Sequence, residues 1–168
     1  MIRILLSIVL LIPSFAFADS VDEKVNAIYT RMSEGYASLD VNLMKKVYDS
    51  DYVYVAPGKH DPVWKGLEDM LFKDGRFFTE MQERKNRVSI KFRVIDRKKT
   101  GQMVADVGFY SFQITSPDQN VDTSYGKFLI TSILQSNGHW LFYSDMDVDA
   151  LKKDYEGVKK ISELKYDL

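Results

Sequence analysis

Aspartates and tyrosines, rather than histidines or cysteines, are the residues of this chain that could carry chemistry. The chain has two histidines and no cysteine. His60 lies beside Asp61 in a turn bounded by proline and glycine, and His139 adjoins a hairpin turn. No metal-binding histidine motif, no Gly-x-Ser-x-Gly motif and no phosphate-binding glycine pattern occurs. The sequence therefore predicts neither a metal site nor a cofactor.

Two aspartates on predicted strands, Asp145 and Asp106, are the candidates for acid–base catalysis. Burial among aromatic rings would raise the pKa of such an acid, which could then donate or accept a proton near neutral pH. Asp106 and Tyr110 lie on the same face of their strand, and the sequence does not determine whether this is the inner or the outer face of the sheet. An exposed acid at a strand end is the alternative for Asp145. The acidic alternation that continues through Asp147 and Asp149 favours this alternative.

Hydrophobic periodicity predicts three helices before the sheet. The first runs from Ser20 to Leu39, and a capping box over its first turn marks where it begins. The second runs from Asp40 to Tyr48, and a short alternating strand follows it at residues 52–55. The third runs from Leu67 to Phe72, with Gly75 expected to end or bend it.

Four longer strands are predicted after the helices. The segment 97–101 is the expected turn between the first two, and Asn137-Gly138 is a strong hairpin signal between the last two. Helices followed by an antiparallel meander indicate the α+β class. The four strands are Arg87 to Asp96, Met103 to Thr115, Thr123 to Leu134 and His139 to Val148.

The segment from Asp40 to Gly66 carries a resemblance to a known superfamily. It combines a short helix, an alternating aromatic strand, a Pro57-Gly58 turn and Trp64 before the next helix. With a long helix before it and four strands after it, the chain resembles the nuclear-transport-factor-2-like superfamily, in its SnoaL-like and ketosteroid-isomerase-like branch. The resemblance implies a cone-shaped barrel: a curved antiparallel sheet wrapped on three N-terminal helices, with a C-terminal helical tail.

Ketosteroid isomerase provides a test of function. It uses an aspartate base and an oxyanion hole formed by a tyrosine and a protonated aspartic acid. In an alignment that starts at Asp40, the tyrosine position falls on Met32 and the base position on Ala56. The oxyanion aspartate falls near Ile130 or Thr131. None of these residues can replace the original group, so the alignment argues against ketosteroid isomerase activity.

The same resemblance implies which side chains face the interior of the cone. SnoaL-like cyclases place a working acid on a late strand, as Asp145 would be placed here. Ordinary core packing is the alternative for each aromatic residue. The implied ligand-binding residues are Met32, Tyr36, Tyr54, Trp64, Tyr110, Tyr143 and Asp145.

Two classes of function remain open. The first is an exported, non-catalytic module that binds a small apolar or aromatic molecule in the cone. The second is a cofactor-independent lyase, cyclase or isomerase that uses Asp145 or Asp106 as its acid or base. The missing isomerase residues favour the first class. An enclosed cavity with a lone buried acid would favour the second, whereas a cone filled by its own side chains would indicate a structural module.

The N-terminus predicts export. Arg3, the apolar segment Ile4 to Ile12 and the Ala-x-Ala site at residues 16–18 form a signal peptide over residues 1–18. The apolar segment is too short to span a bilayer, so we expect no stable membrane insertion after cleavage and a bacterial periplasmic or secreted protein. Residues 19–150 would form the cone domain, and residues 151–168 a helical tail.

Charge and surface aromatics give two predictions about partners. The formal net charge is −1, which argues against nucleic acid binding. Trp140, Phe142 and Phe128 are predicted on the outer face of the sheet, and such an apolar patch usually forms an interface. Because members of the superfamily often dimerise through that face, we expect a homodimer.

Overall fold

The computed structural model describes residues 20–55 and 63–159. The predictions for residues 1–18, for Ala56 and His60, and for the end of the tail lie outside the described residues. Among the residues described, no helix is both long and apolar enough to cross a membrane.

The first helix, α1 (Val21–Ser38), confirms the predicted one. Ser20 is its N-cap: the Ser20 hydroxyl accepts from the Glu23 N–H at 3.2 Å, and the Glu23 carboxylate accepts from the Ser20 N–H at 2.6 Å. Two of the free backbone donors at the helix start are therefore satisfied. Leu39 ends the helix in the left-handed conformation, with φ of 53°.

The next two helices differ in length from the prediction. Helix α2 (Val41–Met44) is shorter, because Tyr48 already begins strand β1 (Tyr48–Val55) and the Val47 carbonyl accepts from the Phe142 N–H at 2.8 Å. Helix α3 (Gly66–Glu83) is longer and passes through Gly75 without ending. A glycine inside a helix costs about 1 kcal/mol. The burial of Phe78 and Met81 beyond it outweighs that cost.

Within residues 20–55 and 63–159, the sheet has six strands in the order β2-β1-β6-β5-β4-β3. The four predicted long strands pair antiparallel, as expected, whereas the short strand β1 pairs with β6 in parallel. The strands other than β1 are β2 (Val63–Lys65), β3 (Arg87–Thr100), β4 (Met103–Thr115), β5 (Val121–Leu134) and β6 (Trp140–Asp149). The predicted turn at 97–101 was wrong, because residues up to Thr100 pair with β4 and only Gly101 and Gln102 form the turn.

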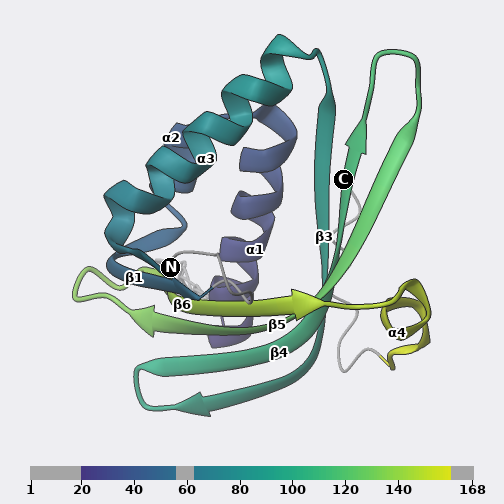
Figure 1. The fold of residues 1–168 in the computed structure, drawn as a ribbon. Helices are drawn as coiled ribbons and strands as arrows, with labels where there is room; N and C mark the ends of the chain where they lie inside the picture. The colour runs from purple at the N-terminus through teal and green to yellow at the C-terminus, as the bar shows by residue number, and fades with distance from the viewer. Residues whose placement is uncertain (1–19, 56–62, 160–168) are drawn as a thin grey trace, which may run out of the picture.

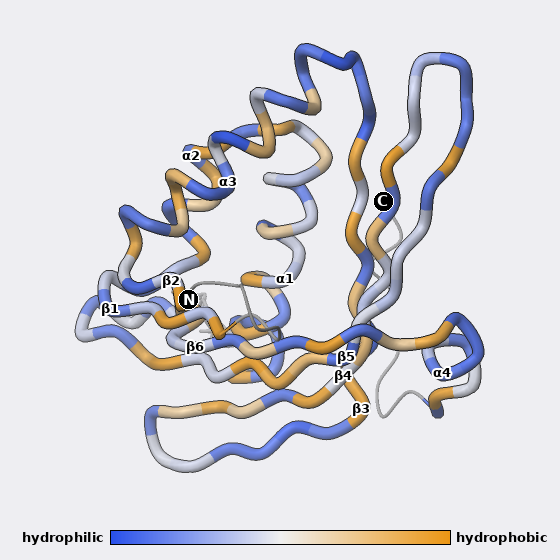
Figure 2. The backbone as a smooth tube through the Cα atoms, viewed as in Figure 1, coloured by the Kyte–Doolittle hydropathy of each residue, from blue (hydrophilic) through white to orange (hydrophobic). Residues whose placement is uncertain are grey.

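The arrangement is a curved open sheet whose hollow side holds α1 and α3 (Figure 1). The long strands β3, β4 and β5 are bent. One half of each strand lies beside the helices, and the other half runs below α1 (Figure 1). Helix α4 (Lys152–Gly157) contacts β4 and β5. Apolar and polar residues alternate along the strands, and one face therefore packs on the helices (Figure 2). This architecture confirms the α+β class.

The aromatic residues predicted on the outer face of the sheet lie in the core instead. Trp140, Phe142 and Phe128 are only 6%, 1% and 2% exposed. Their rings pack beneath α1, where the Tyr29 ring centroid lies 4.8 Å from that of Phe142. The prediction that these residues form an exposed patch was wrong. The outer face instead presents a row of apolar side chains that strand pairing places side by side: Val63, Val55, Met146 and Leu129.

Candidate functional site

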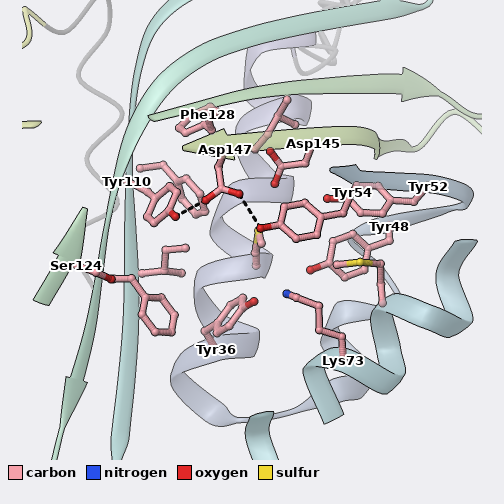
Figure 3. A pocket seen from close by; sticks show the side chains of 16 residues that line it. Tyr36, Tyr48, Tyr52, Tyr54, Lys73, Tyr110, Ser124, Phe128, Asp145 and Asp147 are labelled. Carbon is pink, nitrogen blue, oxygen red and sulfur yellow. Dashed lines mark hydrogen bonds between the residues drawn. The ribbon is translucent and has the colours of Figure 1, made fainter. Parts of the chain in front are cut away.

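A cavity of about 200 Å³ lies between α1, α3 and the hollow face of the sheet. Its walls combine apolar side chains, such as Met32, Phe92 and Phe112, with an unusual number of ionisable groups. These groups come from α1, α3, β1, β4 and β6, and their side chains point toward one another (Figure 3). The ionisable groups are Tyr36, Tyr48, Tyr52, Tyr54, Tyr110, Lys73, Asp145 and Asp147.

Asp145 is the acid with unused hydrogen-bonding capacity. Its Oδ1 atom is buried and has no hydrogen-bond partner among the described residues. Burial, together with the negative charge of Asp147, raises the pKa of Asp145 to about 8. The Lys73 ammonium, the Met146 N–H and the Tyr52 hydroxyl lower it to a smaller extent. Asp145 is therefore largely protonated at neutral pH, and close enough to its pKa to exchange a proton readily.

Asp147 joins two strands through tyrosine hydroxyls. It accepts from the Tyr54 hydroxyl at 2.7 Å and from the Tyr110 hydroxyl, as the dashed lines in Figure 3 show. Burial, followed by the hydrogen bond to Asp147, holds the pKa of both tyrosines well above the ordinary value. Both phenols thus remain protonated, and both oxygens of Asp147 have a donor.

The position of Tyr110 depends on a glycine in the neighbouring strand. Gly126 lies directly opposite Tyr110 in the β4–β5 ladder. A Cβ atom at residue 126 would lie 2.3 Å from Cζ of Tyr110, far inside van der Waals contact. The absence of a side chain therefore lets the Tyr110 ring lie across the strand and reach Asp147.

Helix α3 contributes two consecutive ionisable residues that sequence analysis did not select. Asp74 is buried, accepts from Tyr48 at 3.0 Å and from Tyr36 at 3.3 Å, and has a pKa that burial raises. Lys73 has a half-buried side chain whose Nζ lies 5.1 Å from the Tyr54 ring centroid and points into the cavity (Figure 3). An available signal was the spacing of Asp74 with Met70 and Phe78, which puts an acid on the apolar face of a helix.

Five of the predicted site residues line this cavity. The structure brings together Met32, Tyr36, Tyr54, Tyr110 and Asp145. Trp64 does not join them, because it lines a separate hollow along the outer side of α3. Their role in ligand binding stays a prediction.

Tyr143 was wrongly predicted to face inward with Asp145. A β-bulge in β6 is the reason: Thr131 pairs with Ser144 and the next residue of β5 pairs with Phe142, so Tyr143 has no partner across the ladder. In a regular strand, residues three positions apart point to opposite faces. Because the bulge adds one residue between them, Phe142 and Asp145 both point inward. Tyr143 itself is 37% exposed.

Asp106, the second catalytic candidate, does not line the cavity. Its carboxylate accepts from Arg97 Nε at 2.7 Å and Nη2 at 2.8 Å, and from the Tyr29 hydroxyl at 2.9 Å. It is 1% exposed beneath α1. A carboxylate saturated by a guanidinium and a phenol serves as a structural ion pair. The prediction of a catalytic role for Asp106 finds no support in this geometry.

Neither metal ligands nor sequence relatives assign a function to the chain. In the described part of the chain, no three histidine, cysteine, aspartate or glutamate side chains lie close enough together to hold a metal ion. No protein-family model and no curated protein matches the sequence.

Solved structures confirm the fold that the superfamily resemblance predicted. An NTF2-like superfamily protein from Salmonella enterica serovar Typhimurium has a TM-score of 0.62 at 13% identity, over 76% of this chain and 89% of that one. A ketosteroid isomerase-like protein from Erwinia carotovora has a TM-score of 0.57 at 12% identity, over 76% and 95%. Aln2 from a Streptomyces species has a TM-score of 0.64 at 12% identity, over 75% and 88%. Identities this low establish the shared fold alone.

Proposed function

We propose that this NTF2-like chain is a cofactor-independent proton-transfer enzyme of the isomerase, cyclase or lyase type, with Asp145 as its acid and base. The observation that carries the proposal is the buried Oδ1 of Asp145, which has no hydrogen-bond partner in the described part of the chain and lies in a cavity with aromatic walls. An acid that only stabilised the fold would have its oxygens satisfied by the protein, as those of Asp147 are. Solved proteins of this fold include one named ketosteroid isomerase-like, which is consistent with such chemistry.

The simplest reaction that this geometry supports is enolisation. The Asp145 carboxylate takes a proton from a carbon next to a carbonyl group: the C–H bond breaks, an O–H bond forms on Asp145, and the electron pair moves to the carbonyl oxygen. In a β,γ-unsaturated carbonyl compound the enolate is conjugated with the second double bond, and return of the proton to the γ-carbon shifts that double bond and completes an isomerisation without any other reactant. The pKa of about 8 leaves roughly a tenth of Asp145 ionised at pH 7, so the base is available near neutrality.

Solvent deuterium exchange tests the proposal. Small cyclic and aromatic ketones are incubated with the protein in D₂O, and loss of the α-proton signal is followed by NMR. We expect exchange to slow by about 10²- to 10⁴-fold in Asp145→Asn, the usual contribution of a positioned acid or base. Asp149→Asn is the matched control, because Asp149 lies on the same strand but is exposed. Equal exchange in wild type and Asp145→Asn would refute the proposal.

A non-catalytic binding module is the second candidate. The observation in its favour is that Met32 lines the cavity and cannot donate a proton. In the sequence alignment, Met32 falls on the position of the isomerase tyrosine. In this case a ketone would bind without exchanging deuterium. Asp145→Asn would then change the affinity only modestly, by about 1 kcal/mol, as expected for one neutral hydrogen bond.

Export remains part of the proposal. The support is the signal peptide predicted over residues 1–18 from sequence, which points to a periplasmic or secreted protein. Intact-mass measurement of protein exported from a bacterial host would show an N-terminus at Asp19. Retention of residues 1–18 on the exported protein would contradict this proposal.

A further inference from the structure

Most hydroxyl protons in the cavity are already used within the protein. A tyrosine hydroxyl has a single proton to donate. The Tyr54 and Tyr110 hydroxyls both donate to Asp147. A second pair of tyrosine hydroxyls donates to Asp74 on α3. These four phenols therefore have no free proton for a ligand oxygen.

Apart from Asp145, which the proposed function uses as its acid and base, the remaining polar groups leave one strong donor for a ligand among the described residues of the cavity. Tyr52 interacts with Asp145 through its hydroxyl, and Ser124 lies on an exposed part of β5 at the rim. Lys73 carries three N–H donors on a flexible stem. The nearest carboxylate oxygen, on Asp74, is 3.8 Å from its Nζ, which is too long for a hydrogen bond. Lys73 thus retains protons that it can direct into the cavity.

Electrostatics at neutral pH favours an oxygen ligand at this ammonium. Asp145 is largely uncharged, so of the two cavity aspartates only Asp147 repels a negative charge that develops in the cavity, and both oxygens of Asp147 are already paired with tyrosine donors. Lys73 supplies a positive charge in a partly desolvated setting, where such interactions are stronger than in water. The ionisable groups that face Lys73 are Asp74 on its own helix, Tyr36 on α1, Tyr54 on β1, and Asp145 and Asp147 on β6.

The apolar walls and the size of the cavity limit the chemical character and the size of the part of the ligand that carries the oxygen. Phe92, Phe112 and Phe128 offer ring faces and edges from β3, β4 and β5. A volume of about 200 Å³ equals that of roughly seven liquid water molecules. This space suits a body of about one ring, and is below the usual range for drug-sized ligands.

The geometry points to Lys73 as the group that binds the ligand's carbonyl oxygen and stabilises it as an enolate, and hence to single-ring carbonyl compounds as the substrate class. This assignment rests on the proposed function of Asp145 and adds the second half of that chemistry. Asp145 removes the proton, and the oxygen that gains the electron pair lies against the Lys73 ammonium.

A coloured phenol tests the assignment, because a phenolate has the charge and shape of a ring enolate. The probe is 4-nitrophenol, whose absorbance reports directly whether the bound molecule is ionised. We expect the wild-type protein to bind the phenolate and to lower the pKa of the bound probe below its value in water. In Lys73→Met, phenolate affinity should fall about ten- to a hundredfold, as for loss of a charge-assisted hydrogen bond. Lys73→Arg should keep much of the affinity.

Two controls separate this effect from a loss of structure. The uncharged ether 4-nitroanisole should bind equally well to wild type and Lys73→Met. Lys45→Met removes an exposed lysine outside the cavity and should change nothing. Equal phenolate binding by wild type and Lys73→Met, a preference of wild type for the neutral phenol, or no binding at millimolar probe would each overturn the assignment.

The two proposals can fail separately. Deuterium exchange that requires Asp145 but is unchanged in Lys73→Met would overturn the role of Lys73 and leave the proposed function standing. Phenolate binding that requires Lys73, without any ketone exchange, would support the oxygen site and refute the proposed function.

Discussion

Asp145 and Asp147 stand two residues apart on β6 and differ in how their oxygens are satisfied. Asp147 has two phenol donors, whereas Oδ1 of Asp145 has no partner among the described residues. Burial without a donor penalises the charged form of a carboxyl group. The protonation state of Asp145 therefore affects both the proposed chemistry and the stability of the fold.

Asp145→Asn should make the protein more stable than wild type at alkaline pH. The pKa of Asp145 rises from 3.8 in the unfolded chain to about 8 in the folded one. Between these values the unfolded chain loses the proton while the folded protein keeps it, so wild-type stability falls as pH rises. The free-energy difference should grow by on the order of 5 kcal/mol between pH 4 and pH 8 and level off above it.

Urea unfolding of both proteins from pH 4.5 to 9 measures this difference. Asp149→Asn should follow the wild-type pH profile, because Asp149 is exposed. A difference between wild type and Asp145→Asn that does not change with pH would show that Asp145 titrates at its ordinary pKa.

Asp106→Asn should destabilise the fold. Arg97 is largely buried against Asp106, and removing the carboxylate charge would leave the guanidinium without its main partner. Breaking a buried ion pair in this way costs about 3 kcal/mol. The matched control is Asp96→Asn, which removes an exposed ion pair with Lys98 and should cost less than about 1 kcal/mol. Urea unfolding compares the two variants.

The same variants decide whether Asp106 takes part in chemistry. Asp106→Asn that remains folded should exchange ketone deuterium at the wild-type rate, because the residue does not line the cavity. A specific loss of exchange, without a loss of stability, would restore Asp106 as a catalytic candidate.

At the level of elements, two local irregularities position the site. The bulge in β6 turns both Phe142 and Asp145 inward, so that a core residue and a cavity acid share one face. Gly126 in β5 leaves room for the Tyr110 ring above it. Each irregularity replaces regular strand geometry with a particular side-chain direction, which is a common use of bulges and glycines in sheets.

Gly126→Ala should displace the Tyr110 ring and break its hydrogen bond to Asp147. The new methyl group would overlap the ring, and overpacking of this kind costs about 1–3 kcal/mol. Thermal unfolding should show a lower midpoint. Gly157→Ala is the control, because a Cβ atom there meets no atom within 4 Å. If Gly126→Ala unfolds at the wild-type temperature, the close contact with Tyr110 is not a constraint.

For the whole molecule, the outer face of the sheet is the candidate interface. Val63, Val55, Met146 and Leu129 form an exposed row across four strands. Apolar rows of this kind are commonly covered by a partner. We therefore propose a homodimer formed through this row, in place of the buried aromatics that the sequence suggested.

Met146→Glu should convert the dimer into a monomer. A carboxylate in the middle of an apolar interface has no partner and loses its hydration. Light scattering at micromolar concentration should give the mass of two chains for wild type and of one chain for the variant. Phe72→Glu changes an exposed apolar residue on α3, away from the row, and should leave the dimer intact. A wild-type mass of one chain would contradict the proposal.

The sequence determined the order and class of the elements because those follow from local patterns. The capping box begins α1 where Ser20 and Glu23 predict it, and the alternation of Met103 to Thr115 is strand β4 from end to end. The inward direction of Tyr36, Tyr54 and Asp145 followed from the superfamily resemblance and the two-residue period of strands.

Tertiary structure decided the features that depend on contacts between distant segments. Helix α3 continues through Gly75 because residues beyond it are buried in the core, a fact that local propensity does not contain. The bulge at Tyr143 arises from pairing with β5, so strand alternation alone placed that residue on the wrong face. Lys73 and Asp74 enter the site because packing of α3 against β1 brings their side chains to the tyrosines. Contacts between residues separated by tens of positions follow from the folded geometry, and this is why Asp145 could be predicted from the sequence but Lys73 and Asp74 could not.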